Sequence, residues 1–115
     1  ILKASKIVAL NHHERWNGQG YPNGLKMDNI PIYGQIVSIA DVFDALASKR
    51  CYKEAFELDS AIEEIMASRD IMFGPYITDA FMKGIDEIVE VLKNSQHLAL
   101  QSKYLLNENI IEAQL

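Results

Sequence analysis

The chain has little cysteine, little positive charge and no long apolar run. The lone cysteine, Cys51, excludes an intrachain disulfide and favours a reducing, cytoplasmic setting. Lys and Arg number 11 against 16 Asp and Glu, which gives a net charge of −5. A surface for nucleic acid polymers needs clustered cations, so no such partner is expected. No apolar run approaches the roughly 18 residues that span a bilayer, so no membrane partner is expected either.

Length and composition allow one small domain. The 115 residues are 49% hydrophobic and 23% charged, as in globular proteins that bury a modest core. The chain opens at Ile1 without a Met or a signal peptide, as expected of a piece cut from a longer polypeptide.

Glycine and proline gather in one segment, residues 16–29, which we expect to form a loop. Apolar residues elsewhere recur at helical spacing and show no strand-like alternation, so an all-α fold is predicted. Ser5 is the expected N-cap of the first helix, and Asp59 or Ser60 that of a later one. Residues 78–93 should form a helix, and residues 94–115 one or two short ones. Residues 33–48 are apolar nearly all round, which predicts a helix buried in the core.

Two adjacent histidines, His12 and His13, and the distant Asp41 are candidate metal ligands. Neighbouring residues of a helix point roughly 100° apart, so the histidines would not readily grip one ion together. They could serve two neighbouring ions, or one could bind while the other supports it. A carboxylate inside an apolar helix needs compensation, which a metal would supply. Pairing of Asp41 with Lys49 or Arg50, or capping of a helix end, is the alternative.

The segment from His12 to Leu25, HHERWNGQGYPNGL, resembles the motif of HD-GYP domains. Further matches follow in the family's order and spacing, at Ile30-Pro31, residues 36–46, Arg50 and residues 52–55. The resemblance implies a partial HD-domain-like helical bundle with a Gly-rich loop between helices. Residues 1–93 would be the C-terminal part of an HD-GYP-like domain, and residues 94–115 a C-terminal helical tail.

The same resemblance implies metal-dependent hydrolysis of cyclic di-GMP, a bacterial signalling molecule, by the parent protein. Two or three divalent ions, iron or manganese, would take part. The match places metal ligation on His12, His13 and Asp41. Substrate binding falls to the residues Arg50, Lys53 and Tyr21, and support of the ligands to Glu14 and Asp44. Without the resemblance, Arg50 and Lys53 would be a solvated pair, Tyr21 a packing residue of the loop, and Glu14 a surface acid.

The sequence also departs from the family pattern at four positions. Asn17 and Gly74 stand where Asp is usual, Gln35 stands near a usual Arg, and Cys51 replaces a Pro. These changes remove none of the ligands named above, but they leave room for an altered activity.

The family's His-Asp motif and a further histidine are absent from the sequence and would precede Ile1. Three ligands cannot hold two ions well, so we expect this piece alone to be inactive. An absence of bound metal in it would agree with that expectation. Exposed apolar surface makes self-association an expected property. Two other functions stay open. One is a degenerate module that contacts a partner signalling domain through the Gly20-Tyr21-Pro22 loop, and the other is an HD phosphohydrolase acting on another nucleotide.

Overall fold

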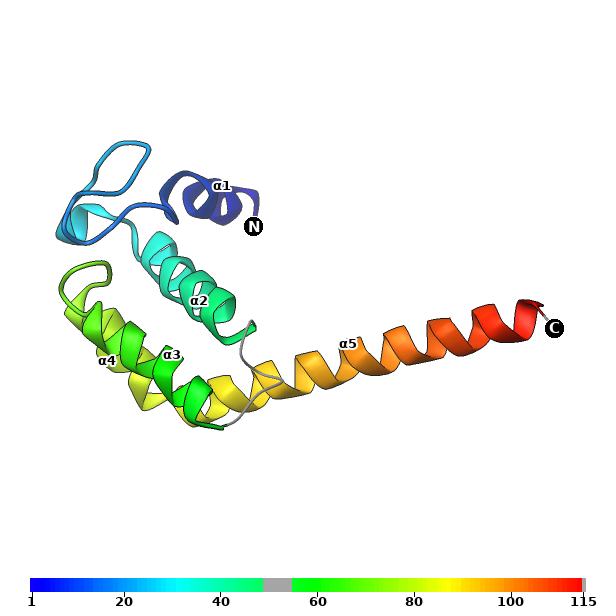
Figure 1. The fold of residues 1–115 in the computed structure, drawn as a ribbon. Coiled ribbons are helices and arrows are strands. Elements are labelled where there is room, and N and C mark those ends of the chain that lie inside the picture. The colour runs from blue at the N-terminus through cyan, green and yellow to red at the C-terminus, as the bar shows by residue number, and fades with distance from the viewer. Residues whose placement is uncertain (49–54, 115) are drawn as a thin grey trace. The chain divides into compact units, whose positions relative to one another are not determined.

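A computed structural model of the chain describes residues 1–48 and 55–114, and its regular elements are helices. Figure 1 shows α1 (Leu2–Asn11), the short 3-10 helix η1 (Met27–Asn29), α2 (Ile32–Ser48), α3 (Ala55–Ala67), α4 (Pro75–Lys83) and α5 (Ile85–Gln114). An isolated bridge between Arg69 and Phe73 is the nearest approach to a strand in these ranges. The prediction of an all-α fold is confirmed. The chain forms two compact units, Ile1–Lys83 and Gly84–Leu115.

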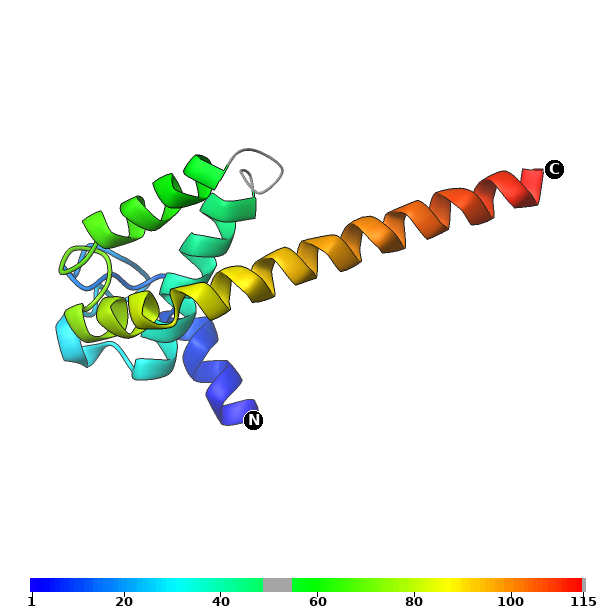
Figure 2. The same cartoon turned by 90° about the horizontal axis from the view of Figure 1, so that it is seen from below.

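The first unit is organised around α2. This helix packs against α1, α3 and α4 (Figures 1 and 2). The rings of Phe43 on α2 and Phe81 on α4 meet edge to face, with centroids 5.2 Å apart. The buried apolar side chains of the described residues are Ile30, Ile39, Phe43, Ala47, Ala61, Ile65, Phe73 and Ile77.

One side of α2 faces solvent, contrary to the prediction that this helix is buried all round. Ile32, Tyr33 and Ile36 are each about half exposed, between 48% and 52%. The three packed helices cover only the side that carries Ile39 and Phe43. Apolar residues on every side of α2 therefore did not result in burial of every side.

The helix starts differ from the predicted caps. The N-cap of α1 is Ile1, whose carbonyl accepts a 2.9 Å hydrogen bond from the Ser5 amide, so Ser5 lies inside the helix. Helix α3 begins at Ala55, which places Asp59 and Ser60 in its interior. The predicted caps were therefore wrong, because propensity alone does not fix where packing lets a helix begin.

The loop between α1 and α2 is held by backbone hydrogen bonds on two sides. The amides of Trp16 and Asn17 donate to the carbonyls of Met72 and Ile71, at 3.0 and 2.9 Å, in the turn between α3 and α4. The Met27 amide donates to the Trp16 carbonyl at 3.0 Å. Residues 16–29 thus form an ordered loop, and the short helix η1 within it was not anticipated.

The second unit is described by itself and consists of one helix. The 30 residues of α5 run without a break from Ile85 to Gln114 (Figure 2). The predicted tail is therefore helical, but as part of one long helix and not as short separate ones. The predicted helix at residues 78–93 is interrupted at Gly84, between α4 and α5. None of the helices in the described ranges is long and apolar enough to cross a membrane.

Candidate functional site

The two histidines lie where α1 ends. His12 is the C-cap of α1, and its Nδ1 lies 2.8 Å from the carbonyl oxygen of Val8, one turn back. A carbonyl can only accept, so Nδ1 must carry the proton in this bond. In the neutral ring the lone pair then sits on Nε2, which is the state in which a histidine binds a metal. The end of α1 therefore fixes which nitrogen of a neutral His12 ring can accept a bond.

His13 contacts two other rings. Its ring centroid is 3.9 Å from that of His12, with the planes tilted by 43°. It also stacks on Tyr21, with centroids 4.8 Å apart and planes 20° from parallel. The Tyr21 amide also donates to the His13 carbonyl at 3.2 Å. Tyr21 is 60% exposed, so its ring contacts His13 and still has surface in contact with solvent.

Glu14 is almost completely buried, with 1% of its surface exposed. Its two carboxylate oxygens accept hydrogen bonds from the amides of Asn23 and Leu25, both at 2.8 Å. We expected this acid to orient a histidine, but its hydrogen bonds in the described part of the chain go to the loop. A buried carboxylate needs such partners, and here they close the loop over the residue that follows the histidines.

Gly20 passes directly against the chain at the histidines. A Cβ at this position would collide with the His13 carbonyl oxygen. It would also lie 2.5 Å from the backbone nitrogen of Arg15 and 2.7 Å from the Cα of Glu14. These contacts involve backbone atoms, which cannot move aside cheaply. Glycine is therefore required for the loop to place Tyr21 on His13.

Arg15 is a structural residue that the sequence reasoning missed. Its Nη1 donates to Ser38 Oγ on α2 at 2.7 Å, and more weakly to the carbonyls of His12 and Glu14, both at 3.4 Å. Ser38 is 3% exposed. This contact connects the histidine segment to the helix that carries Asp41. Because Arg15 and Ser38 are far apart in the sequence, no local pattern predicts that they meet.

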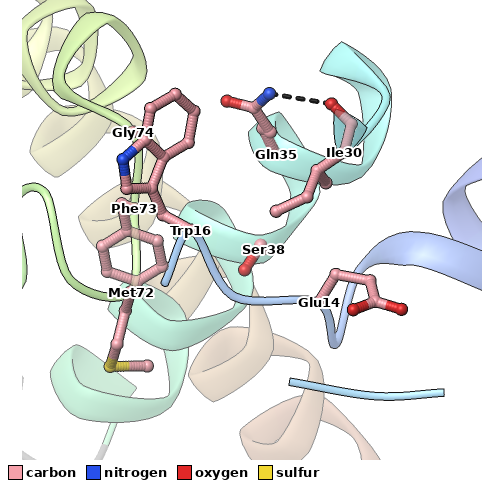
Figure 3. A pocket seen from close by; sticks show the side chains of 8 residues that line it. All are labelled: Glu14, Trp16, Ile30, Gln35, Ser38, Met72, Phe73 and Gly74. Atoms are coloured by element: carbon pink, nitrogen blue, oxygen red, sulfur yellow. Dashed lines mark hydrogen bonds between the residues drawn. The ribbon is translucent and has the colours of Figure 1, made fainter. Parts of the chain in front are cut away.

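A shallow hollow beside this contact contains two of the positions that depart from the family pattern. Figure 3 shows its lining side chains, Glu14, Trp16, Ile30, Gln35, Ser38, Met72, Phe73 and Gly74. Gln35 donates to the Ile30 carbonyl at 2.8 Å. A Cβ on Gly74 would lie 2.8 Å from the Trp16 ring and 3.2 Å from Gln35 Oε1. The hollow is a packing seam between the loop, α2 and the turn that precedes α4.

The remaining predicted residues are spread over other parts of the chain. Asp41 and Asp44 lie on α2, both exposed, so the expected cost of burying Asp41 does not arise. Among the residues whose side chains the structure describes, no group of three or more His, Cys, Asp or Glu is arranged to hold a metal ion. Arg50, Lys53 and Cys51 lie outside the described residues.

The helices and the paired histidines define the class as a helical domain with imidazole donors beside a glycine-rich loop. An HD domain family model matches residues 2–77. The chain belongs to the HD-domain family.

The known proteins that this chain resembles act on cyclic dinucleotides. It is 44% identical over 96 residues to a cyclic di-GMP phosphodiesterase of Thermotoga maritima, which covers 84% of this chain and 26% of that protein. It is 42% identical over 91 residues to a 3′3′-cGAMP-specific phosphodiesterase of Vibrio cholerae, covering 79% of this chain and 17% of that protein.

A solved structure shares the fold. The crystal structure of a cyclic GMP-AMP-specific phosphodiesterase of Vibrio cholerae superposes with a TM-score of 0.68 at 27% identity, and covers 79% of this chain and 21% of its own. The chain spans about a quarter or less of the length of the relatives described here.

Proposed function

We propose that the whole protein to which this chain contributes is a metal-dependent cyclic dinucleotide phosphodiesterase of the HD-GYP type. The observation that carries the proposal is the ordered unit formed by His12, His13 and Tyr21, closed by Glu14. The relatives are named as phosphodiesterases of cyclic di-GMP or of 3′3′-cGAMP, and the HD domain family model matches the segment that contains this unit. Cyclic di-GMP is the proposed substrate, with the mixed dinucleotide as the alternative within the same class.

The donors at the site suit a transition metal. Imidazole nitrogens and a carboxylate favour ions such as iron or manganese. His12 presents a free Nε2, and we propose that it acts with His13 and Asp41 to hold part of a centre of two or three ions. When bound, the ions would activate water and neutralise charge developing on the phosphate. HD-domain phosphodiesterases are generally metal-dependent, and the identity and number of ions belong to the proposal.

The chain's own residues have separate tasks in this proposal. Val8 holds the His12 ring, Tyr21 fixes the face of His13, and Asp44 supports Asp41 on α2. The exposed Tyr21 ring can also contact a base of the substrate. Arg50 and Lys53 would bind the phosphates, Arg through a bidentate fork and Lys as a point charge. A cytoplasmic location is part of the same proposal and rests on the lone cysteine.

The test uses the whole protein loaded with Mn²⁺ or Fe²⁺ and measures hydrolysis of cyclic di-GMP and 3′3′-cGAMP by separation of the products. Asp41→Asn should lower kcat by at least about a hundredfold, because it removes a charged ligand. Asp86→Asn is the matched control, since it removes the same charge from exposed α5. Equal activity in the two variants would end the assignment of Asp41.

For the 115-residue chain alone, we propose that the three ligands are too few for a working centre. Metal content by elemental analysis should be well below two ions per chain, and cleavage should be absent. Robust metal-dependent cleavage by the isolated chain would overturn this part of the proposal and leave the assignment of the whole protein intact.

A second candidate function is a binding module without hydrolysis. It is favoured by the exposure of Tyr21, Pro22 and Asn23 at the tip of the loop, which could meet a partner signalling domain. In that case the whole protein would bind a cyclic dinucleotide or a partner without turnover. An HD phosphohydrolase acting on another nucleotide is distinguished by the same assay with linear nucleotides as substrates.

A further inference from the structure

Arg15 follows the histidine segment and lies where the end of α1 meets α2. Its Nη1 donates a 2.7 Å hydrogen bond to Ser38 Oγ, which is short and charge-assisted. The same nitrogen lies 3.4 Å from the carbonyl oxygens of His12 and Glu14, and these contacts are weaker. One guanidinium group thus contacts the backbone on both sides of His13 and a side chain of α2.

The Ser38 hydroxyl is an enclosed acceptor for this bond. Ser38 is 3% exposed, and its side chain lies beside the chain between Glu14 and Trp16 (Figure 3). Arg15 itself is partly buried. Because water has little access to the hydroxyl, solvent does not readily replace the bond that holds Arg15 against α2.

A second close contact holds the same junction one turn earlier on α2. A Cβ on the buried Gly34 would lie 2.7 Å from Asn11 Cβ and 3.1 Å from the Asn11 carbonyl oxygen. Asn11 is 8% exposed, and its side chain donates to the Ile7 carbonyl at 2.7 Å, one turn back on α1. The histidines are therefore held to α2 at both ends, by Asn11 before them and by Arg15 after them.

Both anchoring points share a face of α2 with Asp41. Gly34, Ser38 and Asp41 are separated by four and three residues, which places them in one row along the helix. Cα–Cβ bonds tilt toward the N-terminus of a helix, so the Asp41 side chain leans toward the Ser38 turn. The bond from Arg15 to Ser38 therefore joins the segment that carries two proposed ligands to the turn of α2 that precedes the third.

We propose that Arg15 is a positioning residue, which acts through Ser38 to set the spacing between the two histidines and Asp41. This inference rests on the proposed function, because it takes those three residues as metal ligands. Loss of a group that orients metal ligands typically costs about ten- to a hundredfold in metal affinity. Without the bond to Ser38, the anchor at Asn11 remains but the anchor after the histidines is lost.

Calorimetric titration of Mn²⁺ into the metal-free whole protein tests the proposal. Ser38→Ala removes the hydroxyl at a helical position without adding bulk, and it should raise the Mn²⁺ dissociation constant by at least about tenfold. Arg15→Gln should do the same. The double variant should bind Mn²⁺ as Arg15→Gln does, because Arg15 acts through Ser38. Losses that add up in the double variant would show that the two residues act independently and would overturn the proposal.

Thr78→Val is the matched control for a merely structural effect. Thr78 is 1% exposed and its hydroxyl donates to the Gly74 carbonyl at 2.8 Å, so this change also deletes a buried hydroxyl bond. The Gly74 carbonyl keeps its 3.0 Å bond from the Thr78 amide. Thr78→Val should therefore bind Mn²⁺ as the native protein does. Equal Mn²⁺ affinities of Ser38→Ala and Thr78→Val would contradict a positioning role.

Asp41→Asn in the same titration separates this inference from the function on which it rests. If Asp41→Asn weakens Mn²⁺ binding and Ser38→Ala does not, the positioning role is wrong and the proposed metal assignment stands. If neither variant weakens Mn²⁺ binding, the assignment of Asp41 fails, and the positioning role fails with it.

Discussion

The carboxylate of Glu14 accepts a hydrogen bond from the amide of Leu25 at 2.8 Å, across eleven positions of the chain. One acid next to the histidines therefore holds the far end of the loop that follows them. Since the carboxylate is 1% exposed, water cannot replace this bond.

Glu14→Gln should destabilise the chain by about 1–3 kcal/mol, because an amide can offer only one oxygen to the two backbone donors. Urea unfolding followed by circular dichroism measures the change. Glu63→Gln, an exposed acid on α3, is the control and should change stability by less than about 0.5 kcal/mol. Equal stabilities of the two variants would show that Glu14 does not hold the loop.

Gly20→Ala should separate Tyr21 from His13, because the added methyl group would collide with the backbone of residues 13–15. We expect the free energy of unfolding to fall by about 2–3 kcal/mol. The ring-current shift that the stacked rings produce in NMR spectra should disappear. Gly24→Ala is the comparison. Its φ of +65° also disfavours alanine, but a Cβ there would lie 3.4 Å from the Gly18 carbonyl oxygen. The free energy of unfolding should therefore fall by only about 1 kcal/mol, with the stacking kept.

Gly74→Ala should disturb Trp16, whose ring would lie 2.8 Å from the new Cβ. Trp16 is the only tryptophan, so its fluorescence reports this contact without interference. We expect a shifted emission maximum and a loss of about 1–3 kcal/mol in the free energy of unfolding. Ala80→Gly on exposed α4 should lower stability by about 1 kcal/mol with unchanged emission. An unchanged emission spectrum in Gly74→Ala would mean that the side chains around residue 74 move apart without disturbing Trp16.

Arg69 and Asp79 form a two-bond ion pair, at 2.8 and 3.0 Å, between the turn before α4 and that helix. The hydrogen bond and charge of Arg69 hold the pKa of Asp79 below its usual value. Because the pKa of Asp79 is lowered in the folded chain, the pair stabilises the fold at pH values above the ordinary carboxyl pKa. This stabilisation is lost as the pH falls through the lowered pKa. Because both groups are exposed, the contribution is small.

NMR titration of the Asp79 carboxyl carbon measures that pKa directly. Arg69→Gln should raise it toward the usual range, whereas Lys3→Gln, which removes the same charge from an exposed position on α1, should leave it lowered. An identical Asp79 pKa in the native chain and in Arg69→Gln would contradict the pairing.

The sequence predicted what depends on local pattern. Helical spacing gave the all-α fold, and the run of glycines gave the loop after His13. The resemblance of residues 12–25 to a known motif led to the family that the comparisons confirm.

Other features could not be predicted because they depend on distant residues. The burial of Glu14, the contact of Arg15 with Ser38 and the approach of Gly74 to Trp16 each join separate segments. Asp41 was expected to be buried because its neighbours are apolar, yet the helices that pack on α2 leave that side open. Assignment of metal ligation to His12, His13 and Asp41 stays a prediction.

The bond between His12 and Val8 couples the tautomer of a candidate metal ligand to the helix that carries it. The ring keeps its proton on Nδ1 only while the last turn of α1 is wound, because the accepting carbonyl belongs to that turn. Fraying of this end would free the ring to rotate and to exchange tautomers. In the proposed metal centre, ion affinity at His12 would therefore depend on how firmly the last turn of α1 is wound, and on whatever packs against that helix.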